Sequence, residues 1–250
     1  MTNLPALPPT TILHVQAGST AYGLNTPNSD TDEIAVYIEP ATEVFRVDNH
    51  TTKTVSQRTQ PEGAPSGPGD IDRIVYPLRK FIQLAVAGNP SVLPALWSPV
   101  IATTDQGIAL CNLAPSFTGR HIIPKFRGYM RNLAHQIMFE PFGDSAEQAC
   151  RRIAAGEAKL AMNAARLGYT CIEIVRWGGQ RRPLVPLPET EWLRAVRNQE
   201  IEYGEWWDRI HGLDMVLNKL ETDTGYPAGP NRDAIQTWMI EAHRDNWNRP

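Results

Sequence analysis

Two aspartates separated by one residue follow a Gly-Ser pair near the start of the chain, in the stretch GSTAYGLNTPNSDTD (18–32). Side chains two positions apart on a strand point to the same face, so Asp30 and Asp32 are expected to project together. Neighbouring carboxylates repel each other unless a divalent cation lies beside them, and oxygen ligands suit Mg²⁺ or Mn²⁺. A magnesium ion held by carboxylates usually shares its coordination with substrate phosphates. The spacing therefore predicts a metal-dependent phosphate site.

The Gly-Ser pair has the properties that a bound triphosphate requires. Gly18 allows close approach to the backbone, and Ser19 offers a hydroxyl and an N–H group. Two metal ions flanking a phosphorus atom would stabilise both the attacking and the leaving oxygen. Another interpretation stays open at this point, because Ser-Asp-Thr-Asp is also a common surface turn in which aspartates bond the backbone.

The elements predicted around this motif form an N-terminal α/β unit. Apolar and β-branched runs between turn residues predict strands, and three- or four-residue apolar spacing predicts helices. Strands are expected at 11–18, 32–40 and 71–76, and helical segments at 19–24, 40–46, 78–88 and 92–99. The Pro- and Gly-rich stretch 61–69 predicts a loop.

From about residue 115 the pattern becomes helical. Helices are expected at 120–139, 145–169, 189–198, 203–221 and 231–247. Residues 172–185 predict two short strands around Gly178-Gly179, a hairpin turn. The expected fold class is α+β, with an α/β domain over 1–115 and a mostly helical domain over 116–250.

Composition is that of an ordinary globular protein, with 42% hydrophobic and 20% charged residues in 250. No apolar run is long enough for a membrane span, and the N-terminus does not resemble a signal peptide, so a cytoplasmic location without membrane contact is expected. Cys111, Cys150 and Cys171 are scattered and predict reduced thiols. Residues 118–198 carry 13 Lys/Arg against 7 Asp/Glu, which suits either a polyanionic partner or solvated helix faces.

Several stretches together resemble one family. They are the GS…YG…SDxD series, DRIVYPLRKFIQLAVAGNPSVLPALWSP (72–99), FRGYMRNL (126–133), KLAMNAARLG (159–168) and WLRAVRNQEI (192–201). The chain resembles the nucleotidyltransferases of the DNA polymerase beta superfamily, in particular the bacterial and phage branch sometimes found beside RNA ligases. The resemblance implies a polymerase beta-like α/β domain followed by a helical C-terminal domain.

The same resemblance implies the reaction and its cofactors. A nucleoside monophosphate would pass from an NTP, such as ATP, to a hydroxyl acceptor with release of pyrophosphate, assisted by two Mg²⁺ or Mn²⁺ ions. The basic middle segment favours an RNA or tRNA 3′ end as the acceptor. Nucleotidylation of a protein, or a non-catalytic nucleic-acid-binding module on the same fold, are the alternatives.

The resemblance also implies roles for residues. Asp30 and Asp32 would bind both metal ions, and a third carboxylate, Asp72 with Asp70 as the fallback, would ligate the catalytic ion and help deprotonate the incoming hydroxyl. Candidates for phosphate contacts are Gly18, Ser19, Lys80, Lys159 and Arg166, with Arg127 and Arg131 as further basic residues. Candidates for stacking and backbone contacts with RNA are Trp177, Trp192, Arg176, Arg181 and Arg182. Solvated surface charge and core packing are the alternative interpretations for the basic and the tryptophan residues.

The chain departs from the family pattern at two places. After the second aspartate the family usually continues Arg-Gly-Val, whereas this chain has Glu33-Ile34-Ala35-Val36, and Asn163 stands where the family often has histidine. Neither departure changes a carboxylate, so an active enzyme is expected.

Overall fold

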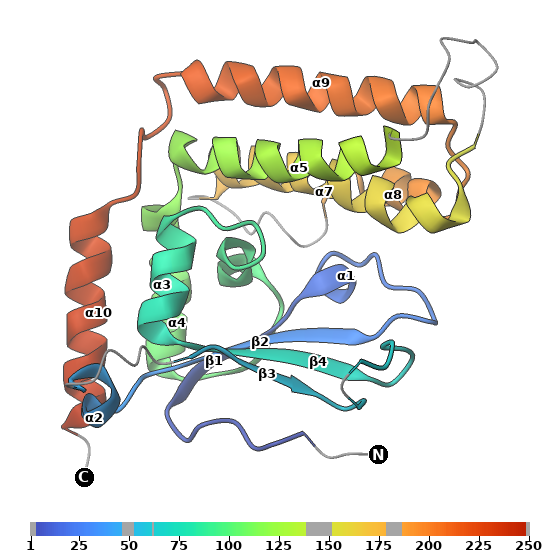
Figure 1. Cartoon of the computed structure of the whole chain (residues 1–250). Helices are drawn as coiled ribbons and strands as arrows, with labels where there is room; N and C mark the ends of the chain where they lie inside the picture. The colour runs from blue at the N-terminus through green and yellow to red at the C-terminus, as the bar shows by residue number, and fades with distance from the viewer. Residues whose placement is uncertain (1–3, 47–52, 62, 139–151, 179–186, 249–250) are drawn as a thin grey trace. The chain divides into compact units, whose positions relative to one another are not determined.

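The computed structural model describes residues 4–46, 53–61, 63–138, 152–178 and 187–248 (Figure 1). The chain divides into two compact units. The sheet unit comprises Met1–Ala87, Ser91–Phe117 and Asn231–Pro250, and the helical unit comprises Gly88–Pro90 and Thr118–Pro230. The first boundary lies close to the predicted one at 115, but the last segment belongs with the sheet rather than with the helices that precede it.

In the sheet unit, the described residues form a sheet of five strands in the order β3-β4-β2-β1-β5. Their bounds are Thr11–Gln16 (β1), Thr31–Tyr37 (β2), Val55–Arg58 (β3), Ile71–Pro77 (β4) and Val100–Thr103 (β5). Strands β2 and β4 are parallel, and every other neighbouring pair is antiparallel. The three strands predicted from sequence are confirmed and form the middle of the sheet.

The two edge strands were not predicted. All four residues of β5 are exposed, and β3 buries only Gln57 among its four residues. Short edge strands of this kind lack the apolar alternation by which a strand is recognised in a sequence. Val55–Arg58, which precedes the 61–69 loop, is therefore part of the sheet.

Helices of the sheet unit are short except at the C-terminus. They are α1 (Gly18–Ala21), α2 (Ala41–Val44), α3 (Leu78–Val86), η1 (Leu93–Trp97), α4 (Asp105–Asn112), η2 (Ala114–Phe117) and α10 (Arg232–Trp247). Helix α3 begins after Pro77, as predicted, and buries Leu78, Phe81, Ile82 and Ala85. Helix α4 was not predicted; the hydroxyl of Thr104 caps it by accepting from the Gly107 N–H at 3.3 Å.

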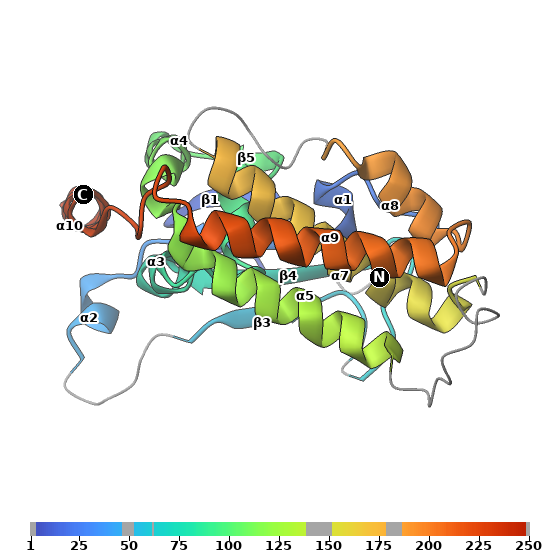
Figure 2. The same cartoon turned by 90° about the horizontal axis from the view of Figure 1, so that it is seen from above.

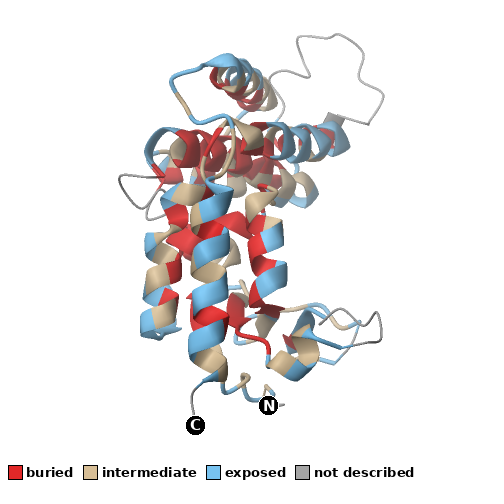
Figure 3. Cartoon of the chain, turned by 90° about the vertical axis from the view of Figure 1, so that its left-hand side faces the viewer, coloured by how far each residue is buried: buried red, intermediate tan, exposed pale blue. Residues whose placement is uncertain are grey.

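Helix α10 is fixed to the sheet unit by the buried Glu39. The Nε2 atom of His243 lies 3.3 Å from the Glu39 carboxylate, and the Trp247 indole N–H donates to the Glu39 carbonyl oxygen at 2.7 Å. Most of the helix is exposed or intermediate, with a short buried band (Figure 3). These contacts explain why this helix belongs with the sheet.

The described residues of the helical unit form four longer helices, which follow the short η3 (Arg120–Ile122). They are α5 (Ile123–Met138), α7 (Ala155–Trp177), α8 (Thr190–Arg197) and α9 (Tyr203–Thr222), of which α5, α7 and α9 lie alongside one another (Figure 2). A Cβ at Gly168 of α7 would lie 2.9 Å from the Met130 sulfur and 3.0 Å from Leu213 Cδ1. Glycine at that position therefore lets the three helices approach closely.

The predicted hairpin at 172–185 is wrong. Residues 172–177 form the last turns of α7, where Ile172, Ile174 and Val175 are buried. Packing against the neighbouring helices overrides the strand preference of these β-branched residues. Residues 179–186 lie outside the described residues, as do 145–151 at the start of the predicted second helix. Residues 152–154 are not helical, so α7 begins at Ala155, later than the helix predicted at 145–169. The remaining predicted helices are confirmed within a few residues.

The described residues include two cysteines: Cys171 is buried and Cys111 is partly exposed, while Cys150 lies outside the described residues. Among the helices that the structure describes, none combines the length and the hydropathy that a membrane span requires.

Candidate metal and nucleotide site

Three aspartates of the sheet unit bring their carboxylates together. Asp32 on β2 and Asp72 on β4 are direct partners in the parallel pairing, and Asp30 immediately precedes β2. One carboxylate oxygen from each of Asp30, Asp32 and Asp72 lies within 4.8 Å of the other two, and all three residues are partly exposed. The parallel pairing of β2 and β4, which are far apart in sequence, thus brings Asp72 to the two aspartates of the Ser-Asp-Thr-Asp motif.

The Gly18 loop packs directly against this cluster. Gly18 has φ +56°, and a Cβ built on it would overlap with the carboxylate of Asp32. The Ala17 N–H donates to the Asp32 carbonyl oxygen at 2.8 Å, which ties the loop to β2. Ser19 follows in the first turn of α1 and is partly exposed. The structure therefore brings Gly18 and Ser19 to the edge of the aspartate cluster.

Asp72 is held by side chains that sequence reasoning did not single out. The amide of Gln60 donates to Asp72 Oδ1 at 2.8 Å, and the Ser66 hydroxyl donates to Oδ2 at 2.9 Å. Arg58, the β3 partner of Asp72, places its Nε 3.6 Å from Oδ1. Gln60 and Ser66 also contact each other. Recognition of β3 in the sequence would have placed Arg58 beside Asp72; no sequence signal marked Ser66.

Asp70 has different partners from Asp72. Its carboxylate accepts from the Thr59 hydroxyl at 3.0 Å and from the Gly67 N–H at 3.0 Å. Its carbonyl oxygen accepts from the Thr31 N–H at 2.8 Å. These bonds close the turn before β4, and Asp70 is not a member of the three-carboxylate cluster. The geometry favours Asp72 over Asp70 as the third carboxylate.

The predicted basic residues lie on three helices. Lys80 is exposed on α3 of the sheet unit. Lys159 and Arg166 lie on α7 of the helical unit, where Arg166 donates to the Asn163 side chain at 3.3 Å. Arg127 and Arg131 of α5 both form forked hydrogen bonds with Asp214 of α9. The last two are thus bound within the helical unit, which supports a structural role for them.

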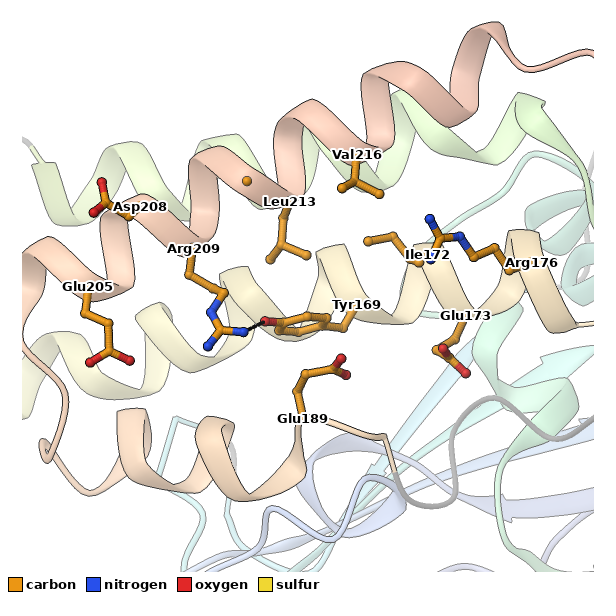
Figure 4. Close-up of a pocket in the computed structure, with 11 residues that line it drawn as sticks. Tyr169, Ile172, Glu173, Arg176, Glu189, Glu205, Asp208, Arg209, Leu213 and Val216 are labelled. Carbon is orange, nitrogen blue, oxygen red and sulfur yellow. Dashed lines mark hydrogen bonds between the residues drawn. The ribbon is translucent and has the colours of Figure 1, made fainter.

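One of the predicted RNA-contact residues, Arg176, lies at a cavity of about 580 Å³ in the helical unit (Figure 4). Arg176 lines it together with the carboxylates of Glu173, Glu189, Glu205 and Asp208. Burial is the main cause of a raised pKa for Glu189, and the carboxylate of Glu173 adds to it. Acidic surroundings of this kind do not favour phosphate contact by Arg176.

Trp192 also has partners inside the helical unit. Its indole N–H donates to Glu205 at 2.8 Å, and the guanidinium of Arg209 lies 4.8 Å from its ring centroid. Trp177 is 41% exposed at the end of α7. Arg181 and Arg182 lie outside the described residues.

The donor set of the aspartate cluster fits a hard divalent cation. Three carboxylates and no sulfur or imidazole ligand come together among the described residues at this place. Oxygen ligands of this kind suit magnesium or manganese rather than zinc. The Gln60 and Ser66 donors orient one of the three carboxylates, as residues outside the ligand set do in metal sites.

A mixed sheet that sets three aspartates beside a Gly-Ser turn is the arrangement of a polymerase beta-like nucleotidyltransferase, an enzyme class that typically uses divalent metals. The family model described as "RNA repair pathway DNA polymerase beta family" (RlaP) matches residues 6–195. The chain belongs to this family. The resemblance expected from the sequence is thereby confirmed.

Two further comparisons are less extensive. An uncharacterized 38.9 kDa protein from the nrdC-mobD intergenic region of Enterobacteria phage T4 is 29% identical over 89 residues, which are 36% of this chain and 26% of the phage protein. The match thus spans well under two thirds of that protein's length. A nucleotidyltransferase-like protein from Exiguobacterium sibiricum matches with a TM-score of 0.29 and 10% identity over 85% of this chain and 69% of that one. That likeness is too low to bear on function.

Proposed function

We propose that this enzyme transfers a nucleoside monophosphate from an NTP to the 3′-hydroxyl of an RNA, with tRNA included, and releases pyrophosphate. Asp30, Asp32 and Asp72 are proposed to hold two Mg²⁺ or Mn²⁺ ions. The observation that carries the proposal is the cluster of these three carboxylates within 4.8 Å on neighbouring parts of one sheet. Membership of a family described by an RNA repair pathway supports RNA as the acceptor.

The proposed reaction is an in-line displacement at the α-phosphorus. The acceptor hydroxyl oxygen forms a bond to the α-phosphorus, and the bond from that phosphorus to the bridging oxygen breaks, so that pyrophosphate leaves. Asp72 takes the proton of the hydroxyl, for which its partly exposed carboxylate is accessible. Bound metal ions would supply charge stabilisation to the attacking and the leaving oxygens.

Other residues bind rather than react in this proposal. Gly18 and Ser19 form the turn against which the phosphates lie, since Gly18 leaves no side chain between the turn and Asp32. Lys80, Lys159 and Arg166 are proposed as phosphate contacts, because all three are basic and not fully buried. ATP is one of the four nucleotides that the assay tests.

The experiment is a labelling assay with bulk tRNA, each of the four NTPs radiolabelled at the α-phosphate, and Mg²⁺ or Mn²⁺. The expected result is label in RNA with the wild type and none with the Asp30→Ala, Asp32→Ala double variant. The nucleotide that gives label identifies the base preference.

A protein acceptor would instead put label into polypeptide, which would replace RNA in the proposal. No label in any macromolecule, together with no metal-dependent NTP binding, would overturn the catalytic proposal and leave a nucleic-acid-binding module. Chelation of the metal by excess EDTA is the control, because label that survives it does not come from this site.

A further inference from the structure

A row of four polar side chains crosses the face of the sheet opposite the three aspartates. It takes one residue from each of four neighbouring strands: His14 of β1, Glu33 of β2, Arg73 of β4 and Gln57 of β3. His14, Glu33 and Gln57 are buried, and the Arg73 side chain is 13% exposed. We call these residues the reverse-face row.

The row is continuous and centres on Glu33. One oxygen of Glu33 lies 2.8 Å from His14 Nε2 and accepts from Arg73 Nε at 2.8 Å. Arg73 Nη1 in turn donates to Gln57 Oε1 at 3.4 Å. Glu33 and Arg73 are direct partners in the β2–β4 pairing, and Gln57 and Arg73 are direct partners in the β3–β4 pairing.

The reverse-face row and the aspartate cluster use consecutive residues of the same strands. Glu33 follows Asp32, and Arg73 follows Asp72. Because consecutive side chains of a strand point to opposite faces, Asp32 and Asp72 share one face, and Glu33 and Arg73 share the other. Gln57 precedes Arg58, which approaches Asp72 on the other face. A change in the register between β4 and β2 would break the Glu33–Arg73 contact and separate Asp32 from Asp72 at the same time.

Apolar side chains also occupy this face of the sheet. Further along the same face Ala35, Tyr37 and Val75 form an apolar cluster against which Leu7 packs. Buried ion pairs often contribute little net stability compared with apolar residues of similar volume, and their best-attested use is to fix a register. The location of the ionic contact, directly behind the proposed metal ligands, is therefore informative.

We propose that Glu33 and Arg73 are positioning residues, which hold β2 and β4 in the register that keeps Asp32 and Asp72 opposed for metal binding. The inference rests on the proposed function, because it takes the three aspartates as metal ligands. His14 and Gln57 extend the same restraint to β1 and β3.

The test measures metal affinity and stability in a double variant of the full chain, Glu33→Leu with Arg73→Met. Both new residues are uncharged, so the net charge of the protein does not change. Mn²⁺ affinity is measured from the electron paramagnetic resonance signal of free Mn²⁺, and stability from the thermal unfolding midpoint. The double variant is expected to bind Mn²⁺ about 10–100-fold more weakly, the range for residues that orient metal ligands. Its unfolding midpoint is expected to fall less than that of either single variant, since the double replacement leaves no buried charge unpaired, while His14 and Gln57 each lose one hydrogen bond.

The matched control is Val75→Ala, which lies on the same strand and face as Arg73 but outside the row. It is expected to lower the unfolding midpoint without changing Mn²⁺ affinity. An equal loss of affinity in this control would mean that any damage to the sheet weakens metal binding, and would overturn the positioning role.

Arg73→Lys is a second variant of the row, to be measured if the double variant does not fold. Lysine keeps the charge but not the forked guanidinium that bonds Glu33 and Gln57 together, so a several-fold loss of affinity in a folded protein is expected. Wild-type affinity in every folded variant of the row would overturn the proposal and leave the metal site standing. Absence of Mn²⁺ binding by the wild type would overturn the proposed metal site and this inference with it.

Discussion

Asp70 and Asp72 lie two positions apart, and the sequence alone did not decide which of them is the third carboxylate. The structure separates them by their partners. Asp72 faces Asp32 across the parallel strand pair, whereas Asp70 bonds Thr59 and Gly67 in the preceding turn. A pattern of period two shows which residues share a face, but the register between strands decides which of them meet.

This difference predicts opposite results for two equivalent substitutions. Asp72→Asn is expected to lower kcat by at least about 100-fold, comparable to the loss of one group that stabilises transition-state charge. Its effect on thermal unfolding is expected to be small, because relief of the repulsion with Asp30 and Asp32 offsets the weakened bonds to Gln60 and Ser66. Asp70→Asn is expected to keep kcat within a few-fold of the wild type but to lower the unfolding midpoint. Steady-state transfer rates and thermal scans on both variants check this, and the reverse order of the two kcat values would contradict the assignment.

Gly18 offers a second prediction about a single residue. Alanine there would overlap with the Asp32 carboxylate in a backbone conformation with φ +56°, which adds strain of about 1–2 kcal/mol for an L residue. We expect Gly18→Ala to abolish measurable transfer and to lower stability.

Gly128→Ala is the matched control for that variant. Gly128 is exposed on α5, and apart from its chain neighbours and the backbone of its own helix no described atom lies within 4 Å of the Cβ that alanine would add. This variant is expected to be about 0.5–1 kcal/mol more stable than the wild type. Chemical denaturation measures both variants, and a stable, active Gly18→Ala would show that the loop does not pack as described.

Among the elements, those with a strong apolar pattern were predictable from sequence. The buried strands β1, β2 and β4 and helices such as α3, with its apolar face after Pro77, were recognised close to their true bounds. The edge strands β3 and β5 were not, because paired backbone rather than buried side chains defines them. The end of α7 was read as strands, since packing with α5 and α9 cannot be seen in a local pattern.

The contact between α5 and α9 gives a prediction about elements and pH. Arg127 Nε and Nη2 donate to the two oxygens of Asp214 at 2.8 and 3.0 Å, and Arg131 adds a second fork at 2.7 and 2.8 Å. The hydrogen bond from Arg127 is the largest cause of a pKa for Asp214 well below its ordinary value of 3.8; partial burial opposes this and Arg131 adds to it.

Asp214→Asn is therefore expected to lower the free energy of unfolding at pH 7 by about 1–3 kcal/mol. A carboxyl whose pKa is lowered by folding stabilises the protein above its unfolded pKa, and this contribution is lost as the pH falls through the folded value. The difference between the wild type and the variant should thus shrink below about pH 4. Urea unfolding across pH checks it; a difference that grows in acid would contradict the ion-pair account.

At the scale of the whole molecule, neither of the two units is a single continuous segment of the chain. Residues 231–250 return to the sheet unit, where His243 and Trp247 contact Glu39. We propose that a fragment of residues 1–117 does not fold stably by itself, because it exposes the surface that α10 covers.

Joining residues 231–250 to that fragment through a flexible linker is expected to restore a cooperative unfolding transition. The same linked fragment with Trp247→Ala serves as the control and should unfold at a lower temperature. Circular dichroism on the three fragments decides the point, and a cooperative transition in 1–117 alone would contradict this division of the chain.

The central claim for the molecule is that Asp30, Asp32 and Asp72 together hold the metal ions of nucleotidyl transfer. The most direct measurement is anomalous X-ray scattering from crystals of the full chain grown with Mn²⁺ and an NTP that carries a non-hydrolysable bond after its α-phosphate. The account predicts manganese peaks in contact with oxygens of all three aspartates and with the triphosphate, beside Gly18 and Ser19. Manganese bound elsewhere, or a triphosphate bound with no metal at these carboxylates, would contradict it.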